Sequence, residues 1–214
     1  MSENVKRRYD APRRAERAAA TRRAVLAAAR ALFTERGYAK TSVSDIAELA
    51  GTSVDTVYGS VGRKPVLLRE LVESALSGTD HAVPAAERDY VVQVRAARTG
   101  REKIDLYAAA VTGIHTRLAP VFLALRDAAA ADPACAALWR TIAERRARNM
   151  LDFAADLRAT GHLRPDLTDD EVADIVWSMN AVEYWVLLVH ERGWSPDRFR
   201  GWIADAWARS LLVS

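Results

Sequence analysis

Apolar residues recur every three to four positions along most of the chain, a spacing typical of amphipathic helices rather than strands. From Thr21 this spacing runs through Phe33, and Gly37 is placed to end the helix at Arg36. Similar segments follow as far as the C-terminus. The pattern predicts an all-α fold.

Two short helices are predicted directly after the first. Ser42 can cap one helix together with Asp45, and Gly51 ends it after about two turns. Ser53 can then cap a third helix that runs through Ser60. Two short helices joined by a glycine turn form a helix-turn-helix.

The third helix has an unusual outer face. Val57 and Val61 are four residues apart and are expected to face the core. Small side chains elsewhere would let the backbone approach a bulky partner, as a recognition helix does in the major groove of DNA. The positions on these other faces are Val54, Asp55, Tyr58 and Gly59.

Longer helices are predicted downstream. Pro65 suits the first position of a helix that ends at Ser77-Gly78, and residues 79–100 read as a linker containing a modest helix. A long helix over 101–118 is expected to break or restart at Pro120. Asp132-Pro133 opens the next helix, which closes at Gly161.

The last two helices carry much of the tryptophan. Thr168 and Glu171 form a capping box, and the helix they open is predicted to continue past residue 186 with two apolar faces. Ser195-Pro196 starts the final helix, which has a wide apolar stripe. Because exposed stripes are costly, we expect a homodimer joined through these helices. The alternative is that other helices of the same subunit cover the second apolar stripe.

Charge is unevenly distributed. Residues 1–69 carry a net charge of +7, whereas residues 70–214 carry −4. A polyanionic partner at the basic end is the natural interpretation. Residues 1–20 contain few large apolar side chains, so this basic arm is expected to be mobile and to become helical toward residue 21. A solvated tail without a partner is the other reading.

Candidate chemistry is sparse. Cys135 is the single cysteine and sits among alanines, which indicates a buried structural residue. The four histidines lack metal-ligand spacing, and no phosphate loop or nucleophile elbow occurs. We therefore expect no enzyme, cofactor or metal. No run approaches the roughly 20 apolar residues of a membrane span, and the N-terminus lacks a signal peptide, so we expect a cytoplasmic protein without membrane contact.

The segment VLAAARALFTERGYAKTSVSDIAELAGTSVDTVYGSVGRKPVLL contains four motifs in order: ERGY, T-S-V-x-D-I-A, A-G-x-S-x-x-T-x-Y and G-x-K-x-x-L-L. In residues and spacing it resembles the N-terminal signature of the tetracycline-repressor (TetR) family of transcriptional regulators. The remaining chain resembles this family only in length and all-helical layout. The resemblance implies that the first three helices bind operator DNA, that the following helix connects them to a ligand-binding bundle, and that the last two helices dimerise.

Carried onto this sequence, the resemblance implies two sets of DNA-contacting residues. Hydroxyls, a lysine and a helix N-terminus are also chemically suited to phosphate. The phosphate set is Ser42, Thr52, Ser53, Thr56, Tyr58 and Lys64, and the base-facing set is Val54, Asp55 and Gly59. Asp55 would either accept from a cytosine amino group or make a structural contact such as a cap or a pair with Arg63.

A ligand cavity is expected within the long helices. Buried polar groups need partners, so the polar candidates carry most weight. The candidate lining residues are Tyr107, His115, Phe122, Trp139, Asn149, Met150, Phe153, Trp177, Asn180 and Tyr184.

These observations predict a basic arm (1–20), a helix-turn-helix domain (21–64) and a ligand-binding and dimerisation domain (65–214). The predicted function is a homodimeric regulator, most simply a repressor, that binds a palindromic operator and is released by a small, mostly apolar ligand. The alternative is a helical dimer that binds ligands or proteins and has lost specific DNA binding.

Overall fold

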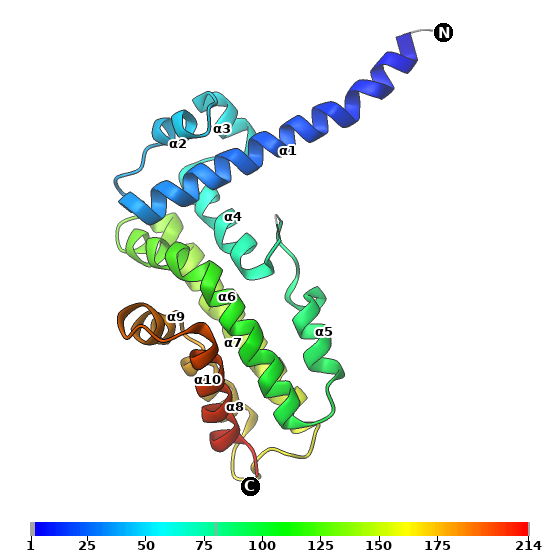
Figure 1. The fold of residues 1–214 in the computed structure, drawn as a ribbon, viewed down its shortest axis with the longest axis vertical. Coiled ribbons are helices and arrows are strands. Elements are labelled where there is room, and N and C mark those ends of the chain that lie inside the picture. Colours follow the sequence, from blue (N-terminus) through cyan, green and yellow to red (C-terminus); the bar gives the residue numbers. More distant parts are fainter. Residues whose placement is uncertain (1–2, 80, 214) are drawn as a thin grey trace.

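The computed structural model describes residues 3–79 and 81–213, and side chains from residue 13 onward. Its described part is all-helical, as the periodicity predicts (Figure 1). The elements are α1 Glu3–Arg36, α2 Val43–Leu49, α3 Val54–Ser60, α4 Lys64–Ser77, η1 Ala85–Glu87, α5 Asp89–Ala96, α6 Gly100–Ala129, α7 Pro133–Arg158, α8 Asp169–Met179, α9 Val182–Trp185, η2 Val186–Glu191 and α10 Pro196–Leu211.

Helices α1 to α3 form the predicted three-helix unit at one end of the molecule, and α4 leads away from it (Figure 1). The Ser42 side chain accepts from the Asp45 backbone N–H, and the Asp45 carboxylate accepts from the Ser42 N–H, which completes the predicted capping box. Ser53 caps α3. Gly37 and Gly51 adopt the positive φ values that end the two preceding helices.

Helix α1 differs from its prediction. It begins at Glu3 rather than near residue 21, so the backbone of the basic arm is helical throughout its described length. Figure 1 shows this end projecting beyond the other helices. The segment is rich in alanine and arginine, whose helix propensity is high.

The long helices α6 and α7 run side by side and extend below α4 in the view of Figure 1. Helix α5 covers one side of this pair, and α8, α9 and α10 cover the other (Figure 1). Helix α6 supplies the core, with sixteen buried residues. By length and hydropathy alone, the helical stretches Gly100–Ala129 and Asp169–Glu191 would be long and apolar enough to cross a membrane, contrary to the prediction, although a central core helix such as α6 meets the same criteria.

Pro120 does not break α6 as expected. A proline removes one backbone donor and disturbs the preceding turn of a helix. In that turn, the Arg117 carbonyl accepts a hydrogen bond of 2.6 Å from the Arg30 guanidinium of α1. The Arg117 guanidinium in turn donates to the Ala75 carbonyl of α4 at 3.1 Å. A tertiary network thus surrounds the proline and connects α1, α4 and α6.

The helix predicted to run from Thr168 past residue 186 is interrupted. Helix α8 ends at Met179, Asn180 caps it, and Ala181 is extended before α9 begins. The following segment, Val186–Glu191, is a π-helix, a form often found near functional sites. The interruption rotates the downstream residues, so the two continuous apolar faces predicted for this helix do not exist.

Candidate nucleic-acid interface and central cavity

The outer face of α3 is exposed as the sequence predicts. Val57 is fully buried, whereas Tyr58 is 48% exposed and Asp55 and Gly59 also face solvent. Val61, expected in the core, is the C-cap and is only partly buried. Val54, predicted to face a base, is also partly buried and packs against the core as Val61 does, so α3 rests on these valines and presents its opposite face outward.

Arg22 of α1 positions the C-terminal end of α3. Its guanidinium donates to the Ser60 carbonyl at 3.4 Å and forms an ion pair with Glu70 of α4 at 2.6 Å. One side chain thus bridges three helices. This arrangement fixes α3 relative to its neighbours.

Hydroxyl groups gather at the N-terminus of α3. The Ser53 oxygen accepts from the Thr56 backbone N–H at 3.1 Å, and the two side-chain oxygens lie 2.8 Å apart. Ser42 plays the same capping role on α2. A capping hydroxyl accepts through its oxygen, so its hydrogen can be donated to a phosphate. Thr52 lies, half-buried, in the turn between the two helices.

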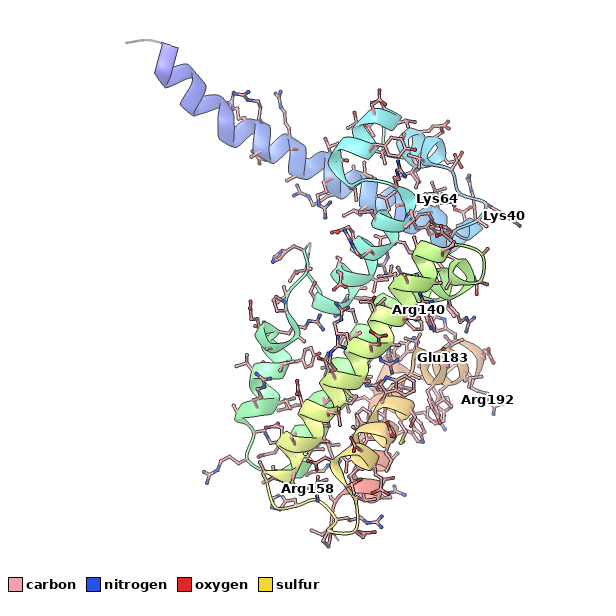
Figure 2. All side chains as sticks on the ribbon, turned by 180° about the vertical axis from the view of Figure 1, so that it is seen from behind. Lys40, Lys64, Arg140, Arg158, Glu183 and Arg192 are labelled. Atoms are coloured by element: carbon pink, nitrogen blue, oxygen red, sulfur yellow. The ribbon has the colours of Figure 1, made fainter. Side chains whose placement is uncertain are left out.

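Lys64 is more enclosed than expected. Its ammonium donates to the Tyr38 carbonyl at 2.7 Å and lies 4.1 Å from the Tyr38 ring centroid. Burial lowers the pKa of Lys64. The Tyr38 hydroxyl donates to Asp132 at 2.9 Å, so Lys64 stands at the junction with the long helices (Figure 2). An ammonium has three donors, and a phosphate contact by Lys64 stays a prediction.

Asp55 has no ion pair among the described residues, and the proposed pairing with Arg63 is not formed. The capping role belongs to Ser53 instead. A hydrogen bond from a cytosine amino group to Asp55 therefore stays a prediction. The Lys6, Arg7 and Arg8 side chains of the basic arm lie outside the described ones.

A cavity of about 370 Å³ lies between α5, α6 and α7 and extends to the α8–α9 break. This volume falls within the range of small-molecule sites. Seven of the ten predicted lining residues surround it: Tyr107, His115, Phe122, Asn149, Met150, Phe153 and Asn180.

A polar cluster closes one end of the cavity. The Asn180 amide donates to the Tyr107 hydroxyl at 2.7 Å, and the Met150 sulfur lies 3.4 Å from that oxygen. Arg146 donates to the Asn180 side-chain oxygen and, at 2.8 Å, to the Trp177 carbonyl. A cation at the C-terminus of a helix complements its dipole, which helps to explain why α8 ends there.

Three predicted lining residues lie elsewhere. Trp139 packs outside Phe122, with ring centroids 4.6 Å apart. Trp177 turns its indole toward the Arg146 guanidinium, 5.0 Å from the ring centroid. The helix break carries Tyr184 to the surface, where it is 38% exposed. None of these three residues lines the cavity.

The sequence reasoning missed one wall of the cavity. Helix α5 and the turn before it contribute Arg88, Tyr90, Val91 and Val94, all from the segment interpreted as a linker. Arg146 was missed because the run ERRAR looks like a solvated helix face. The sequence pattern that could have indicated α5 is the weak helical spacing of apolar residues in DYVVQVRA.

His115 is the most isolated polar group of the cavity. It is 4% exposed, and neither ring nitrogen has a hydrogen-bond partner among the described residues. Burial lowers the pKa of His115 to about 3, and the positive charge of Arg146 acts in the same direction. The ring is neutral at physiological pH and offers one donor and one acceptor to a ligand.

Acidification should reduce stability through His115. Its folded pKa of about 3 lies below its unfolded value, so between roughly pH 3 and 6.5 the unfolded state binds more protons and the free energy of unfolding rises with pH. The loss through this group should be about 2 kcal/mol at pH 5 relative to neutral pH. Denaturant titrations at both pH values should show a smaller loss for His115→Gln than for wild type. Equal losses would contradict the assignment.

Comparisons with known proteins agree with this architecture. Residues 25–71 match the family model for bacterial regulatory proteins of the tetR family. The HTH-type transcriptional regulator TtgR and the probable HTH-type transcriptional regulator ArpR, both of Pseudomonas putida, are each 36% identical over 74 residues. These matches cover 35% of this chain and only 35% of each relative.

Solved structures extend the likeness over the whole fold. A putative transcriptional regulator from Saccharomonospora viridis, in complex with choline, has a TM-score of 0.67 at 20% identity and covers 90% of this chain and 98% of its own. NalD, the secondary repressor of the MexAB-OprM multidrug efflux pump in Pseudomonas aeruginosa, has a TM-score of 0.69 at 19% identity, covering 90% and 96%. Residues 25–71 thus carry the helix-turn-helix of the tetR family, and the chain as a whole shares the fold of these solved regulators.

Proposed function

We propose that the protein is a cytoplasmic, homodimeric repressor that binds a palindromic operator through α3 and is released when a small ligand enters the central cavity. The observation that carries this proposal is the outward face of α3, held by Arg22 and exposed at Tyr58 and Gly59. Two such helices would lie about 34 Å apart or slightly more, to match half-sites near one helical turn apart.

The proposed domains follow the sequence-based boundaries. Residues 1–20 would form a basic arm, 21–64 the DNA-binding unit and 65–214 the ligand-binding and dimerisation domain. Helix α1 runs through the first boundary without interruption, so the arm would act as its extension. Helix α4 begins at the second boundary and connects the two units.

A substitution of Tyr58 tests the DNA-binding face. Tyr58→Ala should weaken binding to all duplexes by about tenfold, because a hydrogen bond to a charged phosphate oxygen is lost without a change in base reading. Fluorescence anisotropy on specific and random duplexes measures this, with thermal unfolding as the folding control. An unchanged affinity would favour the alternative of a helical binding protein without a DNA function.

An ion pair joins the cavity to the connecting helix. Arg145 lines the cavity, and its guanidinium lies 2.9 Å from the Glu73 carboxylate of α4. Glu73 is 15% exposed, so this pair is more shielded than an ordinary surface pair. A ligand that displaces Arg145 would therefore act directly on the helix that carries the DNA-binding unit.

Loss of this pair should weaken the link between ligand and DNA. Glu73→Gln should still bind the operator, but the ratio of its affinities without and with ligand should fall by about fivefold, since allosteric coupling is typically 1–3 kcal/mol. Anisotropy titrations with a compound selected by thermal shift would measure both affinities. Asp127→Asn, at an exposed carboxylate of α6, serves as control. Identical ratios for the Glu73 variant and wild type would contradict this route.

A further inference from the structure

Some of the charged residues that line the cavity form ion pairs within the protein, and those that remain are not balanced in sign. Arg145 is paired with Glu73, as described above. Asp156 is paired with the buried ammonium of Lys103 at 2.8 Å. These two cavity-lining charges are therefore neutralised within the protein.

The other charged lining residues differ in exposure. Arg95 and Asp152 are exposed to solvent, where water and salt screen them. Arg88 is 8% exposed and Arg146 is half-buried. Neither of these two arginines forms an ion pair among the described residues, and the carboxylate that acts on Arg146 from a distance, that of Glu183, is exposed to solvent. The enclosed part of the cavity thus has an excess of positive charge.

Arg146 has unused hydrogen-bonding capacity. Its contacts to the Trp177 carbonyl and the Asn180 side chain both use one terminal nitrogen. The guanidinium carries five N–H donors, and those on Nε and the second terminal nitrogen have no partner among the described residues. Because both contacts use the terminal nitrogen that would complete a bidentate edge, each free N–H group can donate singly to a carboxylate oxygen.

Arg88 acts on the same region. Its Nε donates to the Val83 carbonyl at 3.1 Å, which fixes the side chain but leaves the charge unmatched. Burial raises the pKa of the Tyr107 hydroxyl, while the positive charges of Arg146 and Arg88 both oppose this rise. Both arginines line the same cavity as this phenol, and so does the unpartnered His115 ring.

Most of the rest of the wall is apolar. Val111, Ile114, Leu118, Phe122 and Phe153 line the cavity without any polar side-chain atom. Such a surface favours a hydrocarbon or aromatic body, because burying apolar area contributes most of the affinity of small ligands. The uncharged polar side chains of the lining are His115, Asn149, Asn180 and the two tyrosines Tyr90 and Tyr107.

We propose that the cavity binds an amphipathic carboxylic acid, with its apolar body among these side chains and its carboxylate on Arg146 near Arg88. This inference rests on the proposed ligand-responsive function and names the chemical class of the ligand. A carboxylate supplies the missing negative charge, and the neutral His115 can donate to it. An ammonium compound meets the same positive groups and is excluded by repulsion.

Matched compounds test the head group. The full chain is titrated calorimetrically with decanoate, decanol and decylamine, and with phenylbutyrate, phenylbutanol and phenylbutylamine. At least one acid should bind, about tenfold or more tightly than its alcohol, and neither amine should bind. The proposal is overturned if no acid binds, or if an alcohol or amine binds as tightly as the matched acid.

Substitutions locate the contact. Arg146→Met should weaken acid binding by about tenfold or more and leave alcohol binding unchanged. Arg148→Met, at an exposed arginine of the same helix, should change neither. Arg146→Lys retains the charge and should keep a preference for the acid, which covers the case in which Arg146→Met does not fold. Equal acid affinity in wild type and folded Arg146→Met, or loss of the acid preference in Arg146→Lys, overturns the site.

Operator binding without ligand is measured separately on the wild-type protein. Normal operator binding together with a preference for alcohols or amines would reject the ligand class and leave the regulatory function standing. Acid binding to a protein that binds no DNA would reject the regulatory function and retain the ligand class.

Discussion

Gly59→Glu should abolish operator binding while leaving the fold intact. Gly59 lies on the exposed face of α3, and a Cβ added there meets no other atom within 4 Å. Its backbone φ is not positive, so a side chain introduces no strain. A carboxylate at this position would face the phosphates in both subunits, and like charges at an interface cost several kcal/mol. We expect a loss of about a hundredfold or more in affinity.

Two variants separate the causes of this loss. Gly59→Ala should fold with equal or up to about 1 kcal/mol greater stability, because alanine favours a helix, and it tests whether any side chain is tolerated. Gln93→Glu adds the same charge on the exposed face of α5 and should leave DNA binding unchanged. Anisotropy titrations and thermal unfolding measure the two properties. Operator binding by Gly59→Glu at wild-type affinity would exclude α3 as the DNA-contacting element.

Leu187→Asp should produce a monomer with little operator affinity. Leu187 is 51% exposed on the π-helical segment, next to the exposed Tyr184. The Tyr184 ring packs against Trp202 of α10 at 5.7 Å, so α9 and α10 share one apolar surface. A buried carboxylate without a partner is strongly destabilising in an interface. A monomer would contact only one half-site, and we expect a loss of operator affinity of about a hundredfold or more.

Val92→Asp is the matched control. Val92 is 55% exposed on α5, which lies on the other side of the α6–α7 pair (Figure 1). The same change of side chain there should leave both oligomeric state and DNA binding unaltered. Sedimentation velocity and anisotropy provide the readouts. Dimerisation of Leu187→Asp with wild-type strength would mean that the interface lies on another surface.

Local signals predicted the starts of helices well. Ser42, Ser53, Asp132, Thr168 and Ser195 each cap the helix predicted for them. A cap depends on hydrogen bonds within three residues of the chain, so its residues are visible in the sequence. The helix-turn-helix could therefore be predicted closely.

Tertiary contacts decide the features that the sequence did not predict. Helix α6 continues through Pro120, and in the turn before this proline the Arg117 carbonyl accepts a hydrogen bond from Arg30, which lies 87 residues earlier in the chain. The break after Met179 accompanies contacts from Arg146. Neither partner can be identified from periodicity, which records only the spacing along one helix.

The residues of the candidate sites also fall into those that local sequence patterns indicate and those that tertiary contacts decide. The outward face of α3 follows from helical geometry and one buried valine, Val57. Polar residues within apolar stripes, such as His115 and Asn180, were found because a buried polar group in such a stripe is unusual. Arg146 and the α5 residues that line the cavity were not predicted, because their burial depends on how separate helices assemble.

Selection of bound fragments from random duplex DNA by the protein tests the central claim most directly. The account predicts enrichment of a palindrome whose half-sites lie about one helical turn apart, and no enrichment with Gly59→Glu. Enrichment of no sequence by the wild-type protein, or of the same sequence by Gly59→Glu, would contradict the claim that two α3 helices read an operator.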